Sequence, residues 1–354
     1  MVASAGGDDR ALLLRVRAEQ GQLEVLRELT GHTDTVDRVG FSTDGKLLAT
    51  GSLDGKIKIW KIKEDGEKKT ETKMETETDS DPLQELEPGD GEISWMAWHP
   101  VGSVIVAGTN GGSVWVWHAE SGQCMFVLGG GGSEELEGST AGCWSTDGKQ
   151  LVAGYGNGTV CVWRLPRTNT FEPVQPLVRY KPKTLVSSAV VSLCWHPTNP
   201  VVAVGFQDGR LALLHASHEQ VVQSSQLAKS ASEGAEEDGD ENCAEHLCFM
   251  SRPSALVVGA LDGLLRVLDG SSWQPRMEVD LGAPITAMLM QAVDPLLAVG
   301  CQNGNVAIID LRTGKIHAVQ RIDVDGDVVY SLLWLDQSTL LASYEDGSIR
   351  LLRL

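Results

Sequence analysis

One short pattern recurs seven times along the chain and constrains the fold more than any other feature. Each copy has an apolar stretch, a small residue, glycine or serine, a turn pair such as Asp-Gly or Asn-Gly, and then an alternating apolar strand. Asp-Gly and Asn-Gly permit the positive φ angles that a tight hairpin requires. The copies span residues 48–60, 106–117, 152–163, 203–214, 257–268, 298–309 and 341–352.

The spacing of the copies predicts an all-β repeat architecture. Successive turn glycines, from Gly55 to Gly347, lie 41 to 57 residues apart. A period of about 40 to 50 residues with four short strands is typical of a β-propeller blade. Seven copies in register therefore predict a propeller.

The first copy resembles a WD repeat. It follows Gly31-His32, and four of its side chains match the His–Ser–Asp–Trp hydrogen-bonded tetrad of that family: His32, Ser52, Asp54 and Trp60. A buried indole N–H and a buried hydroxyl both need partners, which histidine and aspartate supply. The later copies depart from the motif, and we expect apolar packing to hold them.

Two blade counts are open at the level of sequence. Residues 1–29 predict a half blade of two strands, and residues 30–354 predict seven WD-type blades of one propeller. We favour an eight-bladed type with the first blade incomplete; the alternative is a seven-bladed ring whose last blade takes residues 23–29. Residues 61–82 and 227–243 are predicted as flexible inserts.

Composition narrows the class of partner. The net charge is −19, so the chain should repel nucleic acid and anionic membranes and favour a basic protein partner. Seven scattered cysteines without a C-x-x-C pair argue against disulfides and zinc. No run reaches the roughly 18 apolar residues of a membrane span. We expect a cytoplasmic monomer, with the nucleus left open as a second location.

Longer segments resemble the angio-associated migratory cell protein family. They are Ile93–Trp117, Ser145–Trp163 and Ser232–Phe249, and Gly6–Arg17 is similar to the tail of that family's first repeat. The resemblance covers about Gly6 to Leu354. It implies an eight-bladed propeller, and it implies for fungal relatives the escort of a strongly basic ribosomal protein of the large subunit.

Acidic residues concentrate in four connections between repeats. Residues 87–92, 133–137, 233–245 and 323–327 hold 16 acidic residues and no lysine or arginine. In a propeller these connections and the Asp-Gly hairpins open on one face, so this clustering predicts a surface that steers a cationic partner. The stretch from Arg167 to Lys183 is a basic exception.

These patterns predict a non-enzymatic scaffold that captures a basic segment of a large-subunit ribosomal protein. The alternative is a general signalling or migration-linked adaptor. No nucleophile elbow, H-E-x-x-H motif or phosphate loop occurs, so we predict no catalytic residue, metal or cofactor. The predicted partner-binding residues are Asp34, Asp54, Glu92, Asp208, Asp262, Glu345 and Asp346, with Phe206 and Tyr344 as aromatic anchors.

Overall fold

The computed structural model describes residues 1–17, 21–63, 81–129, 136–166, 174–181, 188–227, 243–251, 254–320 and 327–354. Within these ranges every regular element is a β-strand, and no helix occurs. The chain divides into two compact units, residues 1–179 and 180–354, and each unit has four sheets. Most of the predicted inserts at 61–82 and 227–243 lies outside the described residues.

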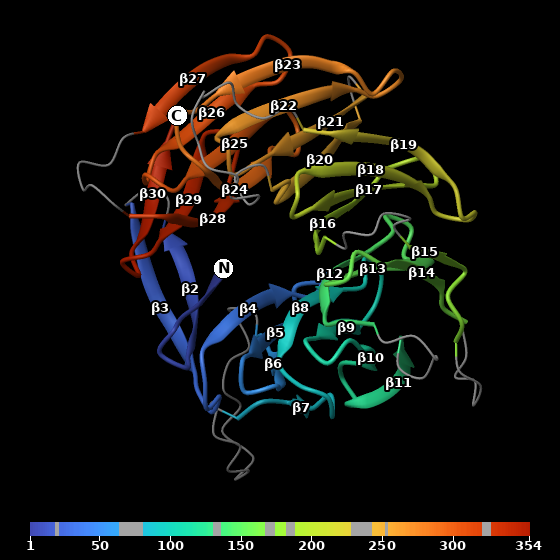
Figure 1. Ribbon diagram of the computed structural model, residues 1–354. Helices are drawn as coiled ribbons and strands as arrows, with labels where there is room; N and C mark the ends of the chain where they lie inside the picture. The colour runs from blue at the N-terminus through green and yellow to red at the C-terminus, as the bar shows by residue number, and fades with distance from the viewer. Residues whose placement is uncertain are drawn as a thin grey trace. The chain divides into compact units, whose positions relative to one another are not determined.

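Unit 1 contains one three-stranded sheet followed by three four-stranded sheets (Figure 1). The first sheet comprises β1 (Val2–Ala5), β2 (Ala11–Arg17) and β3 (Gln22–Leu29). The second comprises β4 (Val36–Phe41), β5 (Leu47–Ser52), β6 (Ile57–Lys61) and β7 (Gln84–Leu86). The third comprises β8 (Ile93–Trp98), β9 (Val104–Thr109), β10 (Val114–His118) and β11 (Gln123–Leu128). The fourth comprises β12 (Ser139–Trp144), β13 (Gln150–Tyr155), β14 (Val160–Arg164) and β15 (Val178–Tyr180).

Unit 2 contains three four-stranded sheets and a final three-stranded sheet. The first comprises β16 (Val190–Trp195), β17 (Val201–Phe206), β18 (Arg210–His215) and β19 (Val221–Gln226). The second comprises β20 (His246–Ser251), β21 (Ser254–Gly259), β22 (Leu264–Asp269) and β23 (Pro275–Asp280). The third comprises β24 (Ile285–Met290), β25 (Leu296–Cys301), β26 (Val306–Asp310) and β27 (Lys315–Gln320). The last comprises β28 (Val329–Trp334), β29 (Thr339–Tyr344) and β30 (Ile349–Arg353).

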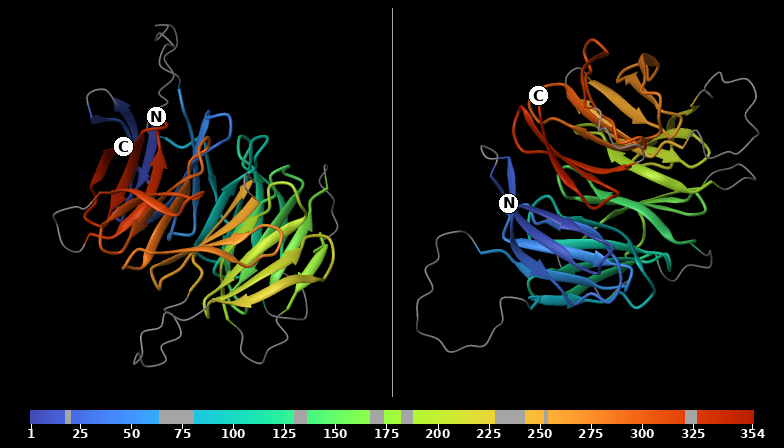
Figure 2. Two further views of the ribbon diagram at one scale, coloured as in Figure 1. Left: turned by 90° about the horizontal axis from the view of Figure 1, so that it is seen from above. Right: turned by 90° about the vertical axis from the view of Figure 1, so that its left-hand side faces the viewer.

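Each sheet is an antiparallel meander of consecutive strands (Figure 2). The predicted turn pairs join the second and third strand of the four-stranded sheets and of the C-terminal three-stranded sheet, as in the β5–β6 hairpin, where Gly55 has a φ of 80°. Glycine adopts this conformation without the steric cost that a Cβ atom would add. Eight sheets support the eight-bladed alternative over the seven-bladed one.

The N-terminal sheet has three strands, and the prediction of a two-strand half blade is wrong. The additional strand is β1, which pairs with β2 from Val2 opposite Leu14 to Ala5 opposite Ala11. Its sequence, Val-Ala-Ser-Ala, is short and made mostly of small residues, so it lacks the alternation that marks a half-buried strand. The strand forms because its backbone pairs with β2, a contact that the sequence pattern does not reveal.

The middle strands are buried on both faces because each sheet packs against neighbouring sheets. All six residues of β5 are buried, and Ile57 and Ile59 of β6 pack in one cluster with Ile105 and Ala107 of β9. In unit 2 a similar cluster joins Val257 of β21 to residues of β24, β25 and β26. Burial on both faces explains the near-continuous apolar runs of the repeat.

In two sheets, the glycine before the hairpin lets a side chain of the innermost strand cross to the next sheet. Trp95 of β8 lies opposite Gly108, and its indole N–H donates to the Ser139 hydroxyl of the next sheet at 2.8 Å. A Cβ atom on Gly108 would lie 2.1 Å from the indole nitrogen. In unit 2, Ser192 passes Gly205 in the same way and donates to the backbone oxygen of Ala244.

We expect Gly108→Ala to lower the free energy of unfolding by about 3 kcal/mol, because the methyl group forces the buried Trp95 indole to move. Urea denaturation followed by tryptophan fluorescence measures the loss. Gly7→Ala is the matched control, since nothing lies within 4 Å of the added methyl group. Equal stability of the two variants would contradict the steric role of Gly108.

Candidate protein-binding site

A buried chain of hydrogen bonds fixes the hairpin between β5 and β6. The His32 ring bonds the Asp54 carboxylate through Nδ1 at 2.9 Å and the Thr50 hydroxyl through Nε2 at 2.9 Å. The Trp60 indole donates to the same hydroxyl at 2.9 Å. This series of hydrogen bonds therefore links the turn to the interior of the sheet.

The prediction that Ser52 supplies the tetrad hydroxyl is wrong, because Thr50 does so. Trp60 lies opposite Leu48 in the β5–β6 register, so Thr50 is its nearest neighbour toward the hairpin on the same face. Ser52 lies one pair farther along and donates instead to the backbone oxygen of Asp34 at 2.9 Å. Both hydroxyl residues share one face, and only the register separates their roles.

The Asp54 carboxylate belongs to this buried chain and faces away from solvent. Its side chain is 4% exposed, and it also accepts the backbone N–H groups of Thr33 and Lys56. Burial raises the pKa of Asp54, but the hydrogen bonds from Thr33, His32 and Lys56 outweigh burial and leave the pKa lowered. The prediction that Asp54 contacts a partner directly is therefore wrong; the residue holds the hairpin.

Three predicted acids of unit 2 already have arginine partners in their own hairpins. Asp262 and Arg266 form a buried ion pair at 2.6 Å, with Asp262 3% exposed. Arg210 bonds Asp208 at 2.6 Å, and Arg350 bonds Asp346 at 3.1 Å. These arginines neutralise much of the charge that the hairpins would present, and the burial of Asp262 contradicts its predicted contact with a partner.

The predicted aromatic anchors are buried. Phe206 is 2% exposed and Tyr344 is 3% exposed. Arg210 lies over the Phe206 ring at 5.0 Å, and Arg350 lies over the Tyr344 ring at 4.6 Å. Both aromatic residues end a second strand, where the side chain points into the sheet packing. The prediction that they anchor a partner is wrong for this reason.

The remaining predicted acids are exposed at turns or loops. Asp34 and Glu92 lie in unit 1, and Glu345 lies in the β29–β30 hairpin of unit 2. The Asp34 carboxylate accepts its neighbour Thr35 N–H at 2.7 Å. These three side chains keep the accessibility that partner contact requires, so their role stays a prediction.

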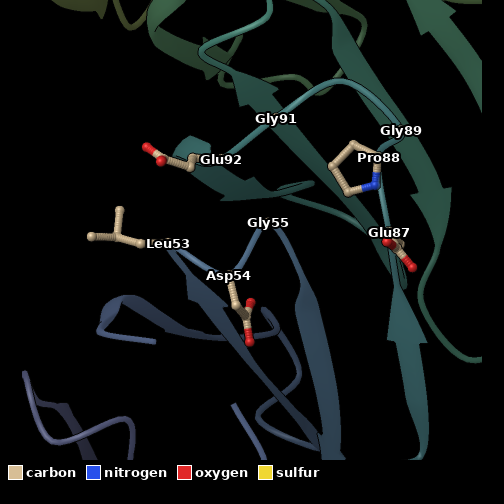
Figure 3. A pocket seen from close by; sticks show the side chains of 8 residues that line it. All are labelled: Leu53, Asp54, Gly55, Glu87, Pro88, Gly89, Gly91 and Glu92. Carbon is tan, nitrogen blue, oxygen red and sulfur yellow. The ribbon is translucent and has the colours of Figure 1, made fainter. Parts of the chain in front are cut away.

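A pocket in unit 1 brings two of the predicted residues together (Figure 3). Its volume is about 320 Å³, and it lies between the β5–β6 hairpin and the connection from Glu87 to Glu92, here called the acidic loop. The residues that line this acidic pocket are Leu53, Asp54, Gly55, Glu87, Pro88, Gly89, Gly91 and Glu92. Figure 3 shows the Leu53 and Glu92 side chains extending to one side, while the Asp54 carboxylate points away toward the strands.

The pocket combines negative charge with an apolar wall. Glu87 and Glu92 are exposed, and Leu53 is 38% exposed although it is a large apolar residue. The backbone N–H of Leu53 donates to the Thr35 oxygen, which places Asp34 beside the pocket. Such a lining suits a side chain with an aliphatic stem and a positive end, as in lysine or arginine.

Asp37 lies near enough to Glu92 for the two charges to interact, although burial is the main cause of its raised pKa. Burial raises the pKa of its carboxyl, Arg38 opposes this, and the nearby charge of Glu92 adds to it. Like charges that lie close together favour protonation, and a cation placed between them relieves the repulsion. Glu87 is predicted as part of an acidic connection but not as a binding residue, whereas Leu53 and Asp37 are not predicted at all. The one sequence signal for Leu53 is its position directly before Asp54 in the turn.

Most of the other acidic connections lies outside the described residues. Their described parts are the end residues Glu137, Asp327 and Glu245, and burial raises the pKa of Glu245. A Cβ atom on Gly304 would lie 2.7 Å from the Asp327 backbone oxygen, so that connection ends beside the β25–β26 hairpin. Within each unit, the end of a connection therefore lies beside the hairpin of the preceding sheet. The contribution of the other acidic residues to a binding surface stays a prediction.

No group of three potential metal ligands occurs among the residues that the structure describes, and all seven cysteines are free thiols. His99 bonds the Gly148 backbone oxygen of the next sheet at 2.9 Å. In the part of the chain that the structure describes, no helix is long and apolar enough to cross a bilayer.

We expect Thr50→Val to destabilise the protein by about 1–3 kcal/mol, because the buried Trp60 indole loses its acceptor. The Trp60 indole N–H should also exchange faster in NMR spectra, with Trp60→Phe providing its assignment. Ser52→Ala is the matched control and should leave that indole signal protected. A shift of the Trp60 signal in the Ser52 variant alone would restore Ser52 to the tetrad.

Comparison with known proteins identifies the repeats. The family model "WD domain, G-beta repeat" matches residues 23–61, 80–118 and 134–164, and the "Anaphase-promoting complex subunit 4 WD40 domain" model matches residues 178–233. Human angio-associated migratory cell protein is 28% identical over 320 residues, which are 89% of this chain and 66% of that protein. Ribosome assembly protein SQT1 of Saccharomyces cerevisiae is 23% identical over 323 residues, which are 89% of this chain and 71% of that protein.

Solved structures agree on the fold. Saccharomyces cerevisiae Sqt1 superposes with a TM-score of 0.82 at 20% identity, covering 99% of this chain and 92% of that one. Chaetomium thermophilum Sqt1 bound to the N-terminus of the ribosomal protein L10 gives a TM-score of 0.79 at 20% identity, covering 99% and 93%. The chain thus has the eight-bladed β-propeller fold of these structures, contains WD repeats at residues 23–61, 80–118 and 134–164, and is similar to angio-associated migratory cell protein and to Sqt1.

Proposed function

We propose that this chain is a non-enzymatic escort that captures a basic segment of a large-subunit ribosomal protein on its acidic pocket. The observation that carries the proposal is the exposed pair Glu87 and Glu92 around a cavity with an apolar wall. A net charge of −19 extends the same preference over the whole chain. The Sqt1 structure that holds the N-terminus of the ribosomal protein L10 has the same fold and supports this choice of client.

The pocket would bind one lysine or arginine side chain of the client. The positive end would lie near the Glu87 and Glu92 carboxylates, and the methylene stem would pack against Leu53. Exposed charges of this kind chiefly raise the association rate and select the partner, while burial of the stem slows dissociation. No bond is made or broken in this role, which fits the absence of a catalytic motif in the sequence.

Unit 1 would supply more of the attraction than the described hairpins of unit 2. Asp208, Asp262 and Asp346 are each paired with an arginine, and releasing such a carboxylate to a client would cost the existing ion pair. Glu87 and Glu92 carry no such arginine contact among the described ion pairs. Glu345 would be the exposed acid through which unit 2 contributes.

A migration-linked or signalling adaptor is the alternative function. The similarity to angio-associated migratory cell protein at 28% identity favours it. An adaptor binds several partners through several surfaces, so charge reversal at the acidic pocket would remove only part of its interactions. Mass spectrometry of proteins that co-purify with the wild-type chain and with the reversed variant separates the two functions.

The triple variant Asp34→Lys, Glu87→Lys and Glu92→Lys should bind a synthetic peptide of the L10 N-terminus at least about tenfold more weakly than wild type. Fluorescence anisotropy across a range of NaCl concentrations measures the affinity. Wild-type binding should weaken as salt rises, because salt screens exposed charges.

The control reverses three exposed acids at the opposite strand ends: Glu120→Lys, Glu219→Lys and Asp294→Lys. Its net charge equals that of the test variant, so a purely global charge effect would weaken both equally. Wild-type affinity that does not change with salt, or equal loss in the two triple variants, would refute capture at the acidic pocket.

A further inference from the structure

The acidic loop is fastened to the hairpin of the following sheet. The Asn110 side-chain oxygen accepts the Glu92 backbone N–H at 3.0 Å, and the Asn110 backbone N–H donates to the Glu92 oxygen at 3.1 Å. A Cβ atom on Gly91 would lie 2.0 Å from that side-chain oxygen, so glycine is required for this approach. Two hydrogen bonds therefore hold one end of the loop in register with β9.

Asp90 fastens the middle of the same loop. One carboxylate oxygen accepts the Trp115 indole N–H at 3.0 Å, and the other accepts the Ser113 backbone N–H at 3.3 Å. In the β5–β6 hairpin, the Lys56 N–H is accepted by Asp54 of the same turn. Ser113 has the same place in its hairpin as Lys56, so Asp90 of the acidic loop accepts the backbone N–H that the hairpin aspartate accepts in the β5–β6 turn.

The β9–β10 hairpin leaves room for this exchange. Its residue in the place of Asp54 is Gly111, and a Cβ atom there would lie 1.9 Å from the Asp90 backbone oxygen. A hairpin aspartate at this position would therefore expel the loop. The absence of a side chain at Gly111 therefore gives Asp90 the space to reach the hairpin.

We propose that Asp90 and Asn110 are positioning residues that hold Glu87 and Glu92 in the geometry that binds the client. The inference rests on the proposed function, because the client is the ligand whose affinity they set. A loop fixed before binding loses less conformational freedom on association, and this lowers the entropic cost of complex formation. The Asp90 charge itself is engaged by Trp115 and Ser113 and is not presented to the client.

Two substitutions of Asp90 separate position from charge. Asp90→Asn removes the charge and keeps one oxygen that can accept the Trp115 indole N–H, although its amide nitrogen cannot accept the Ser113 N–H. Asp90→Ala removes both acceptors. We expect Asp90→Asn to bind the L10 N-terminal peptide within about twofold of wild type and Asp90→Ala to bind about tenfold more weakly. The dependence of affinity on salt should keep the wild-type slope in both variants.

Glu87→Gln with Glu92→Gln provides the contrasting behaviour. This pair should weaken binding and also flatten the dependence on salt, because it removes charges that face the client. A flattened slope in Asp90→Asn would show that Asp90 acts through its charge, and wild-type affinity of Asp90→Ala would show that its contacts do not set the geometry of the loop. Either result would overturn the positioning role.

Asn110→Ala tests the second contact without any client. Hydrogen–deuterium exchange of the Glu92 amide should accelerate in this variant while the exchange of β9 amides stays as in wild type. Unchanged exchange at Glu92 would overturn the inference directly. If wild-type protein fails to bind the peptide, the proposed function is refuted. If Glu92 exchange still accelerates in Asn110→Ala, the role of Asn110 in holding the loop is nevertheless supported.

Discussion

The packing of neighbouring sheets depends on side chains of the innermost strands that cross a glycine and bond to the next sheet. Trp95 passes Gly108 to reach Ser139, and its ring also lies against Gly142 of β12. A bulky indole can be buried between two sheets only where neither strand carries a Cβ atom at the crossing point. This requirement explains the glycine at position 108, although glycine weakens a strand.

A second consequence concerns which acids are free to bind. Two buried hairpin aspartates are engaged inside the fold: Asp54 bonds His32, and Asp262 bonds Arg266. Carboxylates with two or three short internal contacts lose them when a cation competes. Binding chemistry therefore falls to the connections, where Glu87 and Glu92 form no ion pair among the described residues, although the charge of Glu87 helps to raise the pKa of the nearby Lys56.

The sequence was sufficient for the strand pattern and the turn pairs, because alternation and Asp-Gly spacing are local signals. It was insufficient for β1, which acquires its structure from pairing with β2. Which residue supplies the tetrad hydroxyl, Thr50 or Ser52, depends on the β5–β6 register, and a match to the motif does not give that register. Phe206 and Tyr344 have side chains that point inward, and a position beside a turn does not reveal this orientation.

The contact between Asp90 and the β9–β10 hairpin also affects how the chain can be divided into repeats. A boundary drawn at the end of β7 assigns the acidic loop to no blade, yet the turn of the third sheet is completed by a carboxylate from that loop. The third blade is consequently not an interchangeable module: transplanting it without residues 87–92 would leave Ser113 and Trp115 without the acceptor they share. Exchange of blades between relatives of this chain would therefore have to move connection and hairpin together.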